Sequence, residues 1–259
     1  MISFLYSLPD LGVAILLGFL VALAFVAAPL LRARLFGRVS EANSEIARTT
    51  MTTITGFTGV VLAFSLVQAQ GNLRNTEKTV ASEAVQLNQM DRLLTSYGDA
   101  KVAAIREAVH AYAESVVTEE WPKLSEHGSS QRTADLLHTL SQKILAIQPM
   151  PGRENAIYAD LVKITDQLVE SREDRLTAAD LGLPPIFWEG IAFLLVLLVG
   201  FAAFVEPQRG RAISLGGLGI GLALLITLVF IFDQPFLGDM SVTPEPIVKM
   251  LRIMRARTS

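Results

Sequence analysis

The sequence predicts an all-α membrane protein, with four transmembrane helices and a soluble antiparallel helical bundle inserted between the second and third spans. The 259-residue chain is 51% hydrophobic, with a mean hydropathy of +0.43. Crossing a lipid core of about 30 Å takes about 20 apolar helical residues, and a charge at its centre costs about 2.5–3.5 kcal/mol. The chain has four uncharged, apolar runs, of which the first, second and fourth meet this requirement, and one polar block separates the second from the third. The runs are residues 11–31, 49–73, 190–205 and 212–232.

The first and third runs need separate justification as spans. The first ten residues contain no Lys or Arg, and the run that follows is longer than the apolar core of a signal peptide, so we expect a retained helix. The third run is the shortest, and Ile186, Phe187 and Trp188 extend it across the single charge of Glu189. Short connectors, rich in arginine, join the first span to the second and the third to the fourth.

The polar block contains four segments with apolar residues at helical spacing. No proline interrupts residues 71–97, so the second span is predicted to continue beyond the membrane as one long helix. A second helix is predicted to stop at Pro122, a third to begin at Ser129 or Ser130, and a fourth to cover about 153–181. Four amphipathic helices with short breaks predict an antiparallel bundle. The predicted domains are 1–73 (two spans), 74–185 (bundle), 186–232 (two spans) and 233–259 (C-terminal loop and amphipathic tail).

Composition and motifs exclude several functions. Residues 71–186 contain 12 Lys and Arg against 17 Asp and Glu, which argues against a nucleic-acid surface. The absence of cysteine excludes disulfides, thiolate catalysis and cysteine-bound zinc. The three histidines lack paired ligand spacing, and no phosphate-binding loop or hydrolase motif occurs. We therefore predict no enzyme activity, no cofactor and no metal site.

The charged residues of the polar block are expected to be exposed to solvent or to form local ion pairs. Glu119 and Glu120 are expected to lie on a solvated helix end. The run from Arg172 to Arg175 is expected to form ion pairs within its helix or contacts with lipid headgroups.

One face of the second span is mildly polar. The candidate pore-lining residues fall near one side of a helical wheel and are Thr55, Thr58, Leu62, Ser65 and Asn72. Hydroxyl groups can replace the hydration of an ion, and an apolar ring can gate a pore by dewetting. The alternative is that these hydroxyl groups bond to carbonyls of their own helix or to neighbouring helices.

Two further patterns concern packing. Gly217 and Gly221, four residues apart in the last span, are predicted to let helix backbones approach closely. After Pro244 the tail has apolar residues on one face of a short helix, among them Ile247 and Leu251. This helix is expected either to lie on anionic lipid or to pack on the polar block of its own chain.

Landmarks over nearly the whole chain resemble a family of four-span bacterial membrane proteins, the bestrophin-like domain family. They are Glu41-Ala42-Asn43, Tyr112 with Glu120-Trp121-Pro122, Arg172-Glu173-Asp174-Arg175-Leu176, Leu183-Pro184-Pro185 with Trp188, and a motif containing Asp233, Pro235, Phe236 and Gly238. The resemblance implies an oligomeric anion channel whose termini and soluble block are cytoplasmic. The positive charges of the short connectors instead favour an external block. Bestrophins carry an acidic run after Pro-Phe-Gly that can bind calcium, whereas here Leu237 precedes the glycine and Asp239 stands alone, so no calcium site is carried over.

Two functions from different classes follow. The first is a homo-oligomeric, bestrophin-like anion channel in which the second span lines the pore. The second is a membrane-anchored sensory or scaffolding module whose helical domain binds a partner. The expected partners are membrane lipid, further copies of the chain and an inorganic anion, without nucleic acid. The expected location is the cell membrane, as a multi-pass protein of the bacterial inner membrane.

Overall fold

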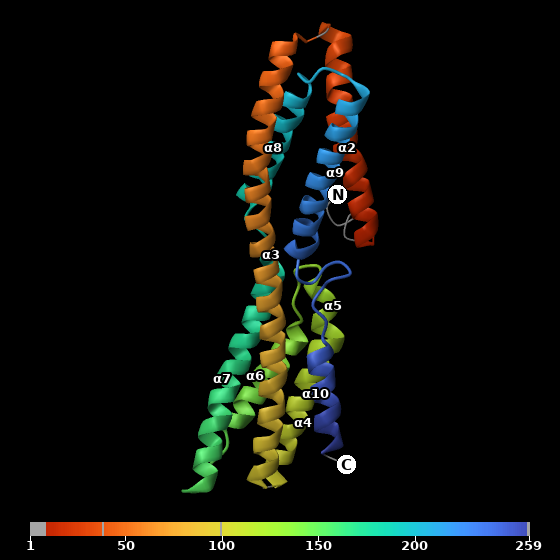
Figure 1. Ribbon diagram of the computed structural model, residues 1–259. Helices are drawn as coiled ribbons and strands as arrows, with labels where there is room; N and C mark the ends of the chain where they lie inside the picture. The colour runs from red at the N-terminus through yellow and green to blue at the C-terminus, as the bar shows by residue number, and fades with distance from the viewer. Residues whose placement is uncertain (1–8, 38, 99, 258–259) are drawn as a thin grey trace. The chain divides into compact units, whose positions relative to one another are not determined.

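The computed structural model describes residues 9–37, 39–98 and 100–257, which form helices and contain no strand (Figure 1). The predicted all-helical class is confirmed, and four helical segments are long and apolar enough to cross a membrane. Three of these segments are α2 (Asp10–Phe36), α3 (Glu41–Tyr97) and α9 (Arg209–Asp233), and the apolar part of the fourth is α8 (Pro185–Ala202). At 1.5 Å per residue the 18 residues of α8 extend about 27 Å, close to the thickness of a lipid core.

The chain divides into two compact units. The first unit contains Met1–Asn72 and Gly182–Met240, and the second contains Leu73–Leu181 and Ser241–Ser259. Helix α3, 57 residues long, contributes to both, as the absence of proline from residues 71–97 led us to expect. The four domain ranges given above, and the position of the polar block outside the membrane as a soluble bundle, stay predictions.

The first unit is held together by apolar side chains of all four spans. Its core includes Phe25, Leu62, Leu198, Leu222 and Val229, each no more than 4% exposed. The outward faces are apolar as well, and only 11% of the most apolar stretch of α2 is buried within the chain. A helix that is apolar on all sides needs lipid or a partner protein around it. Because four such segments are also long enough to cross a lipid core, the chain has the character of a membrane protein.

The second unit consists of the later part of α3 and shorter helices that bury one face each. These are α4 (Ala100–Ser115), a π-helical turn (Val116–Glu120), α5 (Trp121–Leu124), α6 (Gln131–Leu145), α7 (Arg153–Asp180) and α10 (Glu245–Ala256). The predicted helix starts at Ser130 and Arg153 are confirmed: the Ser130 hydroxyl accepts the Thr133 N–H and caps α6. Leu87, Leu140 and Leu161 are fully buried in this unit.

Pro122 does not end the second helix of the polar block, so that prediction was wrong. The helix continues through Trp121–Leu124, with Pro122 in the first turn of α5. The π-helical turn Val116–Glu120 comes directly before it, and the Trp121 N–H donates to the Val116 carbonyl. Such a turn widens the hydrogen-bond ladder where the proline ring would otherwise clash with the preceding turn.

The tail helix α10 packs on its own chain. Ile247, Leu251 and Met254 are buried, and α10 contacts α4. Arg255 pairs with Glu114 at 3.0 Å, which adds a polar contact to this packing. Of the two alternatives for the tail, the structure has the one in which the helix covers the polar block.

Candidate functional site

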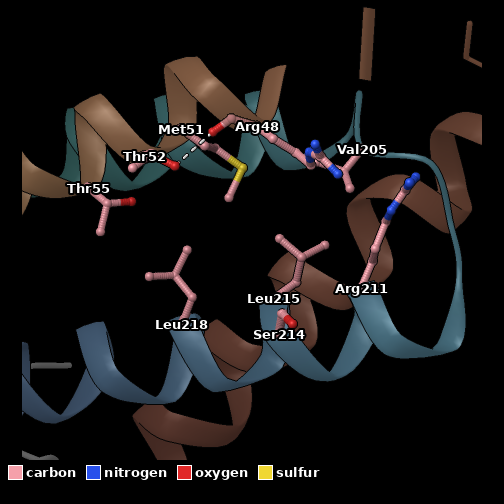
Figure 2. A pocket seen from close by; sticks show the side chains of 9 residues that line it. All are labelled: Arg48, Met51, Thr52, Thr55, Val205, Arg211, Ser214, Leu215 and Leu218. Atoms are coloured by element: carbon pink, nitrogen blue, oxygen red, sulfur yellow. Dashed lines mark hydrogen bonds between the residues drawn. The ribbon is translucent and has the colours of Figure 1, made fainter. Parts of the chain in front are cut away.

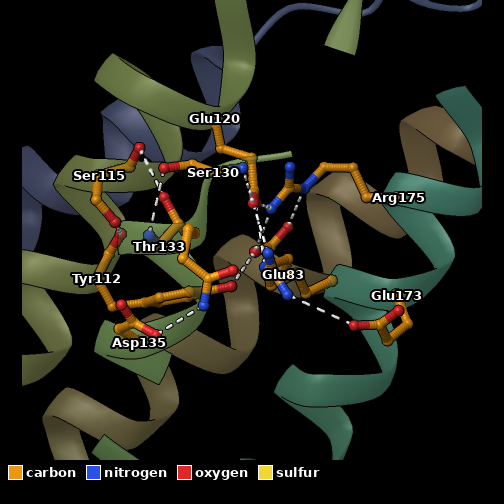
Figure 3. A network of polar contacts seen from close by, with 11 residues as sticks. Glu83, Tyr112, Ser115, Glu120, Ser130, Thr133, Asp135, Glu173 and Arg175 are labelled. Carbon is orange, nitrogen blue, oxygen red and sulfur yellow. Dashed lines mark hydrogen bonds and ion pairs between the residues drawn. The ribbon is translucent and has the colours of Figure 1, made fainter. Parts of the chain in front are cut away.

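A buried ion-pair network occupies the centre of the second unit (Figure 3). Arg175 on α7 donates from Nε to Glu83 Oε2 at 2.8 Å and from Nη2 to Glu120 Oε2 at 2.9 Å. Arg172, one turn earlier, donates from Nη2 to Glu120 Oε1 at 2.6 Å. The Tyr112 hydroxyl donates to Glu83 Oε1 at 2.8 Å. Two carboxylates and two guanidinium groups from three separate parts of the chain therefore neutralise each other.

Burial and neighbouring charges shift the pKa values of two groups in this network. Burial disfavours the Glu120 carboxylate, but the hydrogen bonds from Arg172 and the charge of Arg175 outweigh it and lower the Glu120 pKa. Burial and the neighbouring charge of Glu83 raise the Tyr112 pKa well above its ordinary value. Glu120 is thus held charged and Tyr112 protonated, a pattern of structural pairing rather than of proton transfer.

Two sequence interpretations are corrected by this geometry. Glu120 is fully buried rather than solvated. Arg172 and Arg175 form their main ion pairs across helices, although Arg172 also lies 3.5 Å from Glu173 of its own helix. The sequence signal that could have shown this is spacing, because positions 172 and 175 lie on the buried stripe of α7 that runs from Ile157 to Ala179.

A second polar cluster surrounds Asp91 on α3. Its fully buried carboxylate lies 3.0 Å from Arg106 Nε and 3.2 Å from His110 Nε2 on α4. Its other oxygen accepts from Arg257, at the end of the tail, at 2.9 Å. The cluster links three helices of the second unit. Within the described ranges, no group of three or more His, Cys, Asp or Glu residues is arranged to hold a metal ion.

The predicted polar face of α3 lies inside the first unit. Thr58, Leu62 and Ser65 are no more than 1% exposed, whereas Thr55 and Asn72 are half-buried. The Thr58 hydroxyl donates to the Ile54 carbonyl at 2.8 Å, and the Ser65 hydroxyl donates to the Val61 carbonyl at 2.9 Å. Asn72 Oδ1 accepts from Gln68 at 3.2 Å. Lining of a pore by this set stays a prediction. Within the chain, the Thr58 and Ser65 hydroxyl groups bond to carbonyls of their own helix, as the alternative interpretation expects.

The opposite face of α3 is apolar and accessible. Phe57, Val60, Phe64 and Val67 are between 55% and 69% exposed. They recur at intervals of three and four residues, so they form one stripe along the helix. Sequence reasoning missed this stripe because apolar residues in a span are expected on every side.

The two predicted packing glycines do not make the close contact within the chain. Gly217 and Gly221 have open space at the position of a β-carbon, whereas a β-carbon on Gly219 would lie 2.9 Å from the Ala22 α-carbon of α2. Two residues along a helix correspond to about 200°, so Gly219 faces the other side of α9. The predicted role of Gly217 and Gly221 in close helix packing stays a prediction.

The motif after the last span connects two helices of the first unit. Asp233, at the end of α9, accepts the Leu183 N–H just before α8, and a β-carbon on Gly182 would lie 3.3 Å from Asp233 Oδ1. Pro235 and Phe236 lie in the turn that follows, where Gly238 has φ of +83°. The motif thus fixes the start of one span to the end of another.

A cavity of about 500 Å³ opens between α3 and α9 in the first unit (Figure 2). Arg48 and Arg211 lie at one end of it, and Thr55 and Leu218 lie toward the other. Its walls are otherwise formed by Met51, Thr52, Val205, Ser214 and Leu215. The cavity therefore has a cationic end and a mainly apolar end.

Comparison with known proteins gives one family. The family model described as Bestrophin-like domain matches residues 18–247. A crystal structure of a bacterial bestrophin homologue from Klebsiella pneumoniae superposes with a TM-score of 0.71 at 13% identity, covering 94% of this chain and 98% of that one. A single-substitution variant of that homologue gives 0.68 at 12% identity, with coverage of 93% and 99%. No significant match was found among curated protein sequences.

Proposed function

Because this chain belongs to the Bestrophin-like family, we propose that it is a homo-oligomeric anion channel of the bacterial inner membrane, in which α3 faces the oligomer axis. The observation that carries this proposal is the family match over residues 18–247, together with a fold that covers almost all of a bacterial bestrophin homologue. Four spans of one chain leave little room for a pore of their own. A pore formed between several copies takes only one helix from each copy, so the other three spans remain available for packing.

The accessible stripe of α3 is the part of this helix best placed for such a path. A residue that lines an oligomer axis has to keep surface that its own chain does not cover. The four residues of the stripe are each more than half exposed: Phe57, Val60, Phe64 and Val67. Rings of apolar side chains can gate a pore by dewetting. The polar set predicted from the sequence is the alternative lining, of which Thr55 and Asn72 keep accessible surface.

Anion preference is supported by the charges next to the spans. Arg32, Arg34 and Arg48 lie beside the first connector, and Arg209 and Arg211 lie beside the connector between α8 and α9. These five cations outnumber the three acidic residues of the same segments, which are Glu41, Glu45 and Glu206. A ring of copies would repeat these cations around the axis. An excess of positive charge raises the local concentration of anions. Chloride is therefore the anion to test first.

The test is chloride flux from liposomes that contain the purified oligomer. Wild-type protein should release chloride, and Phe64→Glu should reduce the rate because a charge is added to the proposed lining. Val85→Glu is the matched control, since Val85 is an exposed apolar residue of α3 in the second unit. Absence of flux from verified oligomers would contradict conduction and favour the sensory or scaffolding alternative.

A further inference from the structure

The cavity between α3 and α9 lies on a different face of α3 from the accessible stripe, so the proposed conduction path does not use it. We propose that it is a binding site for an anionic phospholipid, with the phosphodiester between Arg48 and Arg211 and an acyl chain along the apolar walls (Figure 2). This inference does not depend on conduction.

The cationic end of the cavity has a positive charge that no acidic residue of the described chain neutralises. Arg211 Nη1 pairs with Glu206 Oε2 at 3.0 Å, which positions the guanidinium group and neutralises one of the two charges. The Arg48 guanidinium has no hydrogen-bond or ion-pair partner within the described part of the chain. One net positive charge therefore remains, and five N–H donors on each arginine suit the oxygens of a phosphate group.

The position of the two arginines in the sequence sets their depth. Arg48 comes directly before the apolar run 49–73, and Arg211 comes directly before the run 212–232. Charged residues at the ends of membrane helices lie at the level of the lipid headgroups. The phosphates of the surrounding bilayer are found at this same depth.

The remaining walls fit a hydrocarbon chain better than a free ion. Met51, Val205 and Leu215 are buried, and Leu218 is half-buried at the end away from the arginines (Figure 2). The hydroxyl groups of Thr52 and Ser214 already donate to the carbonyls of Arg48 and Gly210, so they offer acceptor oxygens. A phospholipid with hydroxyl groups on its headgroup, such as phosphatidylglycerol, satisfies both ends of the cavity.

The experiment titrates the full chain, solubilised in detergent, with phosphatidylglycerol and measures the dissociation constant by native mass spectrometry. Phosphatidylcholine and inorganic phosphate are titrated in parallel. The proposal expects tight binding of phosphatidylglycerol, weaker binding of phosphatidylcholine and no comparable binding of inorganic phosphate. Arg48→Gln and Arg211→Gln should each weaken phosphatidylglycerol binding about fivefold, and the double variant about 25-fold.

Two variants separate a built site from general attraction. Arg34→Gln removes an exposed arginine in the last turn of α2 that does not line the cavity, so it should leave the dissociation constant unchanged. Leu218→Trp should weaken lipid binding by filling the apolar end while both arginines remain. Equal losses for Arg34→Gln and Arg48→Gln, or binding of inorganic phosphate as tight as that of the lipid, would overturn the proposal. Channel activity does not enter these measurements, so a failure of either proposal is distinguishable from a failure of the other.

Discussion

Arg175 and Glu83, 92 positions apart in the sequence, form a bidentate ion pair at 2.8 and 3.2 Å with both side chains fully buried. Each also has a second partner: Arg175 reaches Glu120, and Glu83 accepts from Tyr112. Arg175 Cζ lies 5.6 Å from the centre of the Trp121 ring, as in a cation–π contact. These contacts connect α3 and α7 to α4 and to the π-helical turn that follows it.

Arg175→Met should strongly destabilise the second unit. The variant leaves the buried Glu83 carboxylate without its counter-charge, and breaking a buried ion pair costs about 3–5 kcal/mol. Thermal unfolding in detergent measures the loss. The control is Arg132→Met, because Arg132 is 73% exposed in its pair with Glu119 and such pairs contribute about 1 kcal/mol or less. Similar, small losses in the two variants would contradict the structural importance of the network.

Acid should weaken the second unit through Glu120. Its pKa in the folded state is below the ordinary value of 4.5, so the folded state favours the charged form. This contribution is present above pH 4.5 and is lost as the pH falls through the lowered pKa. The midpoint of thermal unfolding should therefore fall more steeply below pH 4.5 in the wild type than in Glu120→Gln. Parallel acid profiles of the two proteins would rule out this role.

Gly219→Ala should destabilise the first unit, whereas Gly217→Ala should not. The added methyl group at position 219 meets the α2 backbone at 2.9 Å, while position 217 has open space within the chain. Alanine otherwise favours a helix over glycine by about 0.5–1 kcal/mol, so Gly217→Ala should be neutral or slightly stabilising. Unfolding midpoints of the detergent-solubilised variants give the comparison. A lower midpoint only in Gly217→Ala would show that this position packs on another copy.

Asp233→Ala should loosen the connection between α9 and the start of α8. The variant leaves the buried Leu183 N–H without its acceptor, which costs about 1–3 kcal/mol. Asp239→Ala serves as the control, since Asp239 accepts the Asp10 N–H at 3.3 Å in an exposed position. Proteolysis near residue 183, followed over time, should be faster in Asp233→Ala alone. Equal rates of proteolysis in both variants would show that packing alone holds the end of α9 to the start of α8.

The spans and helix starts could be predicted because local chemistry decides them. Uncharged runs identify the membrane segments, and the Ser130 cap marks the start of α6 in the sequence itself. Partners far apart in the sequence could not be predicted. The pairing of Arg175 with Glu83 depends on how α3 and α7 are aligned, and helical spacing alone allowed local pairs equally well. The inward face of α3 was also ambiguous, because hydropathy identifies a span without showing which of its sides its own chain covers.

The most direct test of conduction along α3 uses the absence of cysteine from the chain. Single cysteines at Phe57, Phe64, Thr58 and Leu62 are introduced, and chloride flux through reconstituted oligomers is measured before and after a charged thiol reagent. We expect loss of flux for Phe57→Cys and Phe64→Cys, with little change for Thr58→Cys, Leu62→Cys and the wild type. Block only at Thr58→Cys or Leu62→Cys would assign the path to the polar face instead. Flux that no α3 modification changes would contradict the account.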